Sequence, residues 1–99
     1  MNLKKTVSGN EAVIAVEGRL DTMTAPQLES EVKQTVGDAD RLELDFEALE
    51  YISSAGLRVL LTAQKAMNAK KGTMVVKNVN EAVKEVFDIT GFNDVLTIE

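Results

Sequence analysis

The sequence contains no cysteine and no histidine among its 99 residues. Without cysteine there is no disulfide and no thiolate nucleophile, and without histidine there is no His-based catalytic triad. Metal sites built from Cys or His ligands are excluded as well. A metal site made of carboxylates alone stays open, but the acidic residues are scattered along the chain. We therefore expect a protein that is not an enzyme and that holds no metal ion or cofactor.

Long apolar runs are also missing, because none approaches the roughly 20 residues of a membrane-spanning helix. The basic residues near the N-terminus have no apolar segment behind them, so they do not predict a secretion signal. The net charge of −5 argues against nucleic acids and anionic membranes as partners, because both attract basic surfaces. These features predict a cytoplasmic protein without nucleic-acid or membrane partners, and a monomer is the default.

The length and composition predict one globular domain over residues 1–99, since 44% of the residues are hydrophobic and 27% are charged. Apolar periodicity and turn residues predict the element order β-β-α-β-α-β-α-β. The expected strands cover 3–7, 11–17, 41–46, 73–77 and 94–98, and residues 47–50 are expected to form a connection with Leu49 tucked beneath it. Three helices are expected between them: one opening at Thr24 and ending at Gly37, one over 57–67, and one between Asn80 and Gly91.

The alternation of strands and helices after the first hairpin implies right-handed crossovers and a mainly parallel sheet. Residues 41–46 alternate strictly between polar and apolar, which is the period of a strand with one buried and one wet face. Helices therefore cover only one face of this sheet. The fold class that we predict is α/β, with a mixed, mainly parallel sheet and helices on one side.

Two helix starts carry capping signals. Thr24 and Gln27 match the capping box, with Pro26 in the first turn, and Asn80 is the expected cap of the third helix. Gly91 is the expected C-terminal glycine of that helix.

The stretch Tyr51–Arg58 joins the strand at 41–46 to the second helix and contains two adjacent serines. Either hydroxyl can cap the helix by accepting a hydrogen bond from a free N–H group of its first turn. The same N–H groups and the positive end of the helix dipole also favour an added phosphate. The turn is therefore suited to a plain N-cap or to a phosphoserine, and the residues alone favour the plain cap.

Tyr51-Ile52-Ser53-Ser54-Ala55-Gly56-Leu57-Arg58 resembles the signature of the anti-sigma factor antagonists, small bacterial regulators with the STAS fold. The resemblance extends over nearly the whole chain, because other family-like segments follow in order and at matching spacings. These segments are Gly18-Arg19-Leu20-Asp21, Leu44-Asp45-Phe46, Gly72 before an apolar strand, and the Val83, Val86-Phe87 and Gly91 pattern.

The resemblance implies a switching function. Unphosphorylated, such a protein binds an anti-sigma factor that is also a serine kinase, and this binding frees the sigma factor. The kinase then phosphorylates a serine of the turn and so releases the antagonist, and a serine phosphatase resets it. The alternative is a non-switching STAS scaffold or accessory subunit of a transport or sensory complex.

In the family motif the phosphorylated serine directly follows an Asp and stands two residues before the Gly, which maps it to Ser54. Ser53 occupies the Asp position, so a carboxylate contact is missing and Ser53 is an alternative acceptor. Asp21 is either a kinase contact or a turn residue, and Arg58 is either a phosphate contact or a solvated side chain. The expected partner-binding residues are Asp21, Thr22, Tyr51, Ser53, Ala55, Gly56 and Arg58.

Overall fold

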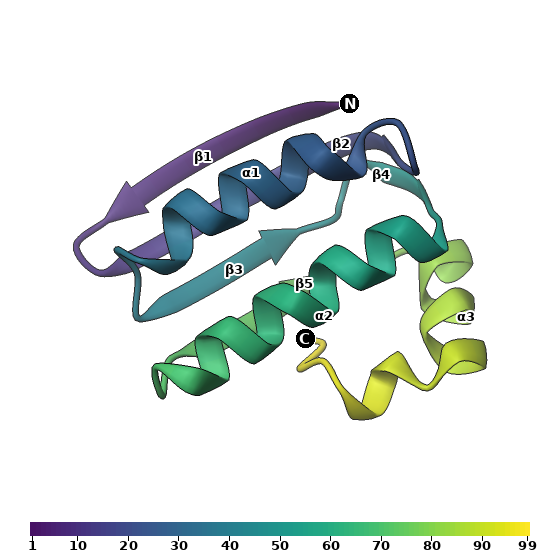
Figure 1. The fold of residues 1–99 in the computed structure, drawn as a ribbon. Helices are drawn as coiled ribbons and strands as arrows, with labels where there is room; N and C mark the ends of the chain where they lie inside the picture. The colour runs from purple at the N-terminus through teal and green to yellow at the C-terminus, as the bar shows by residue number, and fades with distance from the viewer.

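The computed structural model describes all of residues 1–99 and consists of five strands and three α-helices (Figure 1). The predicted α/β class is confirmed, although the order of the elements differs in its second half. In chain order they are β1 (Asn2–Ser8), β2 (Glu11–Leu20), α1 (Ala25–Val36), β3 (Arg41–Asp45), β4 (Leu49–Ile52), α2 (Ser54–Ala69), β5 (Thr73–Lys77), α3 (Glu81–Thr90) and a short 3₁₀ turn, η1 (Phe92–Asp94).

The sheet is mixed and mainly parallel, as predicted. β1 forms an antiparallel hairpin with β2, and β2, β3 and β5 follow side by side in parallel. β2 is long enough to serve two neighbours, because Glu11–Ala15 pair with β3 and Gly18–Leu20 pair with β4. β4 therefore lies beside the part of β2 that extends beyond β3, and the end of β4 lies next to the end of β2.

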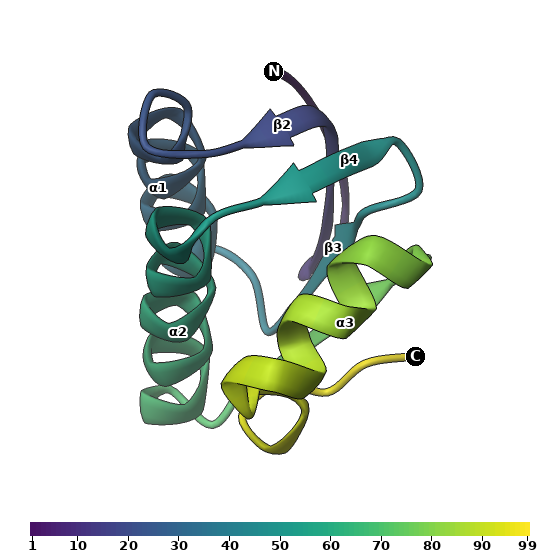
Figure 2. The ribbon, with the colours of Figure 1, turned by 90° about the vertical axis from the view of Figure 1, so that its right-hand side faces the viewer.

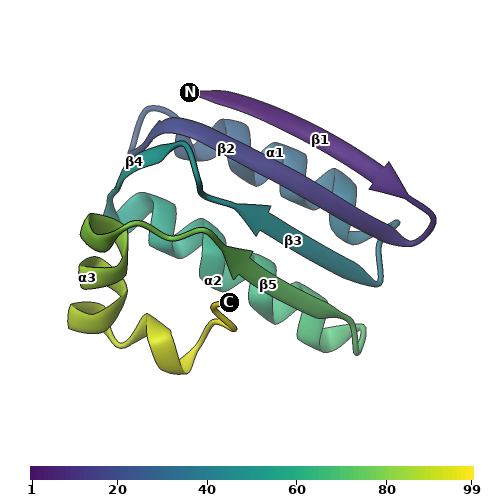
Figure 3. The ribbon, with the colours of Figure 1, turned by 180° about the vertical axis from the view of Figure 1, so that it is seen from behind.

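Helices α1 and α2 lie side by side on one face of the sheet, and the view from behind shows the other face without a helix (Figures 2 and 3). The one-face prediction is confirmed for these two helices. α3 lies at the end of the sheet and contacts β4 instead.

One hydrophobic cluster of 23 buried residues joins the sheet to the helices. Alternate side chains of the central strands, among them Ile14 and Leu44, point to the helices and are fully buried. On the opposite face the strands carry charged side chains that form ion pairs, as expected for a face in contact with water. These pairs are Lys4–Glu17, Arg41–Glu11 and Lys77–Glu43.

The prediction of a plain connection over 47–50 is wrong, because Leu49–Ile52 form β4. Only the two ends of this short strand are buried, so it has no period-two alternation to reveal it. Its partner, β2, lies about 30 positions earlier in the chain, and pairing at that range leaves no mark on local sequence. Leu49 is buried, as expected.

The predicted last strand over 94–98 is also wrong. Residues 92–94 form η1, and only Ile98 makes a bridge, to Val76 of β5. The N–H groups of Val95 and Leu96 both donate to the carbonyl oxygen of Phe92, at 3.0 and 2.8 Å. These local hydrogen bonds curl the segment and turn Leu96 into the core, so an extended strand cannot form there.

The starts of α1 and α3 agree with the sequence, the start of α2 differs, and the capping bond expected at Thr24 is missing. The Asn80 cap is confirmed, since its side chain accepts from the N–H of Val83 at 2.8 Å, and Gly91 ends α3 with a left-handed φ of 79°. α2 begins at Ser54, three residues before the predicted Leu57. The capping box at Thr24 is wrong, because Thr24 stands at the N-cap position without a capping hydrogen bond.

Candidate functional site

Two loops meet where β2 and β4 end. Because these strands are parallel neighbours, their carboxyl ends lie at the same edge of the sheet. The loop Asp21–Thr24 follows β2, and Ser53 follows β4 and leads into α2. The N–H of Ser53 donates to the carbonyl oxygen of Leu20 at 2.9 Å. This hydrogen bond holds Ser53 beside the last residue of β2, where the other loop begins.

The two serines of the turn differ in access. Ser54 is the first residue of α2 and is exposed. Ser53 stands at the N-cap position with extended backbone, φ −102° and ψ 177°, but its hydroxyl caps nothing. The Ser53 Oγ is buried and has no hydrogen-bond partner. Of the two serines, Ser54 is therefore the more accessible.

The two N-cap residues Asn80 and Ser53 give a stability prediction. Asn80→Ala removes the cap on Val83 and a 2.7 Å hydrogen bond from Nδ2 to the carbonyl oxygen of Leu49. We expect it to lower the free energy of unfolding by about 1–2 kcal/mol, the usual cost of a lost cap. Ser53→Ala should change it by less than about 0.5 kcal/mol, because no hydrogen bond is lost. Urea unfolding of both variants provides the measurement, and an equal loss in the two would contradict this account.

Gly56 allows the turn that contains Ser53 and Ser54, here called the serine turn, to lie close to the sheet. A Cβ at this buried position would lie 2.7 Å from Cγ of Leu20 and 2.8 Å from Cγ1 of Ile52, which are the last residues of β2 and β4. Only a residue without a side chain allows the first turn of α2 to approach both strand ends so closely. The position of Ser54 above the sheet edge therefore depends on this glycine.

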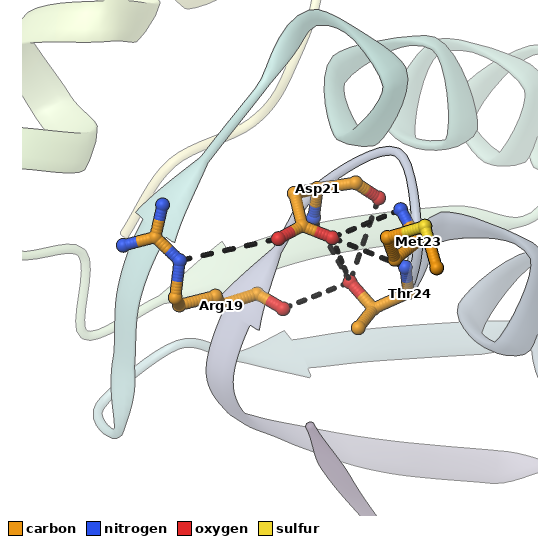
Figure 4. Close-up of polar contacts among 4 residues, drawn as sticks. All are labelled: Arg19, Asp21, Met23 and Thr24. Carbon is orange, nitrogen blue, oxygen red and sulfur yellow. Dashed lines mark hydrogen bonds and ion pairs between the residues drawn. The ribbon is translucent and has the colours of Figure 1, made fainter.

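Asp21 and Thr24 tie the other loop together (Figure 4). The Asp21 Oδ1 accepts from the N–H groups of Met23 and Thr24 at 3.0 and 3.2 Å. The Thr24 hydroxyl donates to the carbonyl oxygen of Arg19 at 2.8 Å and accepts from the N–H of Asp21 at 2.9 Å. This use of the hydroxyl explains why Thr24 does not cap α1. Of the two roles open to Asp21, turn residue and partner contact, the first is directly visible.

The charge of Asp21 is stabilised by its surroundings. Desolvation on its own raises the pKa of the carboxyl group, but the hydrogen bonds from Thr24 and Met23 and the positive charge of Arg19 outweigh it. The net effect is a pKa below the ordinary value of an aspartate. Asp21 therefore remains a carboxylate at neutral pH, and its Oδ2, 3.9 Å from Nε of Arg19, is the oxygen that the loop leaves free.

Arg19 links β2 to β4 on this surface. Its Cζ atom lies 4.2 Å from the centroid of the Tyr51 ring, within the range of a cation–π contact. Tyr51 is 40% exposed and lies directly opposite Arg19 in the β2–β4 register. Arg19 was not among the predicted site residues, and its role depends on β4, which the sequence did not reveal.

The remaining predicted residues surround this centre. Thr22 and Arg58 are exposed, and Arg58 takes part in none of the ion pairs of the structure. Ala55 is half-buried and packs against the core. Met23 was missed, although it is 87% exposed between Thr22 and Thr24. An apolar residue within a polar loop was the signal in the sequence that would have found it.

The surface formed by the two loops is not part of a hollow. None of the hollows on the molecule is lined by a residue of Arg19–Thr24 or of Leu49–Arg58. Small molecules bind in concave pockets, whereas protein partners cover exposed surfaces.

No group of three or more acidic side chains is placed to hold a metal ion. None of the helices combines the length and apolarity needed to cross a bilayer.

Comparison of the sequence with known families gives a match over residues 3–98 to the model described as Mlab, STAS domain. BtrV of Bordetella bronchiseptica, which carries the name of an anti-sigma factor antagonist, is 36% identical over 87 residues. The match covers 87% of this chain and 75% of BtrV. The anti-sigma-B factor antagonist of Bacillus subtilis is 29% identical, with 99% of this chain and 92% of the relative covered.

The fold is similar to that of SpoIIAA, an anti-sigma factor antagonist. Its unphosphorylated form superposes with a TM-score of 0.85 at 20% identity, covering 99% of this chain and 88% of SpoIIAA. The phosphorylated form of SpoIIAA gives a TM-score of 0.78, with 99% and 91% covered. At this identity the likeness concerns the fold alone.

Proposed function

The chain belongs to the STAS domain family, and we propose that it is an anti-sigma factor antagonist whose binding is switched off by phosphorylation of Ser54. One observation carries the proposal: Ser54 is exposed at the start of α2, while the hydroxyl of its neighbour Ser53 is buried. The family relatives supply the partner class, an anti-sigma factor, and the motif supplies its second activity, that of a serine kinase.

The phosphorylation step needs no catalytic group from this chain. The Ser54 Oγ attacks the γ-phosphorus of ATP, the bond to ADP breaks, and the hydroxyl proton passes to a base of the kinase. The product carries an added charge of about −1.5 to −2. Within this protein the N-terminus of α2 tolerates that charge, because free N–H groups and the helix dipole face it.

The same charge disrupts a packed interface. A charge that is buried and poorly paired there costs on the order of 2–5 kcal/mol, which corresponds to roughly 30- to several-thousand-fold in affinity. Release of the partner therefore needs no refolding of this chain. A serine phosphatase that removes the phosphate restores the binding surface.

We propose that the partner covers both loops and the first turn of α2. Tyr51 and Arg58 offer exposed side chains, and Asp21 offers its Oδ2, whose ion pair is the 3.9 Å contact with Arg19, beside exposed Thr22. Gly56 and Ala55 act indirectly, because their close packing against the core sets the position of the turn. Ser53 contributes only backbone because its hydroxyl is buried. In this proposal the protein acts as a cytoplasmic monomer and as a ligand and substrate, not as a catalyst.

One observation favours a second candidate, a non-switching STAS scaffold or accessory subunit. Ser53 stands where the family motif has an Asp, so a kinase finds one carboxylate fewer beside Ser54. A domain that never meets a kinase has no need of that carboxylate. The two candidates differ in whether Ser54 is ever phosphorylated.

The experiment that tests the proposal is a kinase reaction with the purified protein. Each GHKL-type ATPase of the same organism is incubated with the protein, Mg²⁺ and ATP, and the tryptic peptides are then mapped by mass spectrometry. We expect one kinase to add a single phosphate to Ser54, and to add none to Ser54→Ala. Phosphate on Ser53 would contradict the residue assignment, and no phosphate with any ATPase would favour the scaffold.

A further inference from the structure

We propose that Met23 is the principal apolar anchor by which the serine kinase holds this protein. The inference rests on the function proposed above and adds to it a residue that determines partner recognition. Met23 is not part of the family signature and is not among the residues singled out for partner binding. Three properties carry the inference: the exposure of the side chain, the rigidity of the loop beneath it, and its distance from Ser54.

Met23 has the most exposed large apolar side chain of the molecule, at 87%, ahead of Ile89 at 78%. Its neighbours Asp21, Thr22 and Thr24 are polar, so nothing in the loop covers it. A large apolar side chain gains free energy when a partner removes it from water. Anchors of protein interfaces are side chains of this kind that enter a pocket on the partner.

The backbone around Met23 is held in place before any partner binds. Asp21 Oδ1 accepts from the N–H of Met23 itself, and the N–H of Ala25 donates to the carbonyl oxygen of Asp21 at 2.8 Å. The Thr24 hydroxyl fixes the other side of the loop, and these contacts are visible in Figure 4. A rigid loop loses little conformational entropy on binding, while the flexible thioether adapts to the shape of the pocket.

Met23 lies close enough to Ser54 for one interface to cover both residues. Leu20 bonds to the N–H of Ser53 through its carbonyl oxygen. Met23 is three residues after Leu20, so its Cα lies at most about 11.4 Å from that of Leu20, at 3.8 Å per residue. A standard interface buries about 800 Å² per partner, which is a disc of roughly 16 Å radius. The step across to the neighbouring strand and on to Ser54 adds about 9 Å, so Met23 and Ser54 are at most about 20 Å apart. One interface of standard size, centred between the two loops, therefore covers both residues.

The chemistry around Met23 specifies the partner surface. The methionine side chain needs an apolar pocket on the partner. The rim of that pocket needs polar groups, because it faces the ionised Asp21 and the Arg19–Tyr51 pair. Met23 does not touch the reacting atoms, so it affects the binding of the substrate and not the transfer of phosphate. We expect a change at Met23 to raise KM and to leave kcat unchanged.

The test uses the GHKL-type ATPase that phosphorylates Ser54 and the full chain. Met23→Ala and Met23→Gln are compared with Met23→Leu, which keeps an apolar side chain of similar size, and with Ile89→Ala, the matched exposed residue on α3. We expect the first two to raise the dissociation constant and KM at least tenfold. Met23→Leu should stay within threefold of wild type and Ile89→Ala within twofold.

Circular dichroism and urea unfolding check that each variant is folded, and we expect no loss because the side chain has no packing partner. A dissociation constant for Met23→Ala within twofold of wild type would overturn the inference and leave the proposed function standing. An equal loss with Ile89→Ala would overturn it too, since apolar area in general would then be the cause. Failure of every ATPase to bind or phosphorylate the wild-type protein would overturn the proposed function, and this inference with it.

Discussion

Ser54→Asp should weaken binding to the anti-sigma factor kinase by at least about 30-fold, corresponding to a loss of about 2 kcal/mol or more. The carboxylate places a charge at the exposed start of α2, where a packed partner cannot hydrate it. Ser54→Ala removes only a hydroxyl, so it should retain the wild-type affinity and yet resist release by ATP. Isothermal titration calorimetry with and without Mg²⁺-ATP measures both properties.

Ser8→Asp is the control for added charge. Ser8 is an exposed serine at the end of β1, paired with Glu11 at the start of β2. The strand from Glu11 to Leu20 spans about 30 Å at 3.3 Å per residue, so Ser8 lies at the opposite end of the sheet from the serine turn. We expect this variant to bind like wild type. Tight binding by Ser54→Asp, or equal weakening by Ser8→Asp, would contradict the switch.

Gly56→Ala should lower the free energy of unfolding by about 1–2 kcal/mol, because overpacking costs about 1–3 kcal/mol and alanine recovers up to about 1 kcal/mol of helix propensity. The added methyl meets Leu20 and Ile52, which are both almost fully buried and cannot give way freely. To avoid this clash, the first turn of α2 must move away from the strand ends, and the serine turn moves with it. We therefore expect weaker binding of the kinase as well as lower stability.

Gly37→Ala is the matched control for this substitution. Gly37 follows α1 with φ −64° and ψ −27°, and a Cβ there meets nothing within 4 Å. Alanine adopts this backbone without strain and restricts the unfolded chain, which should stabilise the protein by about 0.4–1 kcal/mol. Urea unfolding midpoints should therefore move in opposite directions for the two variants. A stabilising Gly56→Ala would show that α2 does not need its close approach to the strand ends.

The features that the sequence reveals are those with a local cause. The alternation in 41–46 reflects the two faces of β3, and Leu57, Leu60 and Met67, which recur at helical spacing in the sequence, are buried. Asn80 caps α3 because its own side chain reaches an N–H three residues later. Such patterns depend on the period of one element or on one turn, so they can be predicted without the fold.

The features that the sequence does not reveal depend on pairing between distant segments. β4 exists because β2 extends beyond β3, and only then does Arg19 meet Tyr51. Likewise Lys70, at the end of α2, donates at 2.7 and 2.8 Å to the carbonyl oxygens of Val36 and Ala39, more than 30 positions earlier in the chain. In the site, the motif pointed to Ser54, but the burial of the Ser53 hydroxyl could be seen only in the packed structure.

The most direct test of the switch is the phosphorylation state of Ser54 in the cell. The protein is isolated from its own cells during growth and stress, its intact mass is measured, and the peptide containing Tyr51–Arg58 is mapped. We predict two populations that differ by one phosphate, which is located on Ser54, with proportions that change with stress. A protein that stays unmodified under every condition would contradict the switch and favour the scaffold, and a phosphate on Ser53 would contradict the assignment of the exposed hydroxyl.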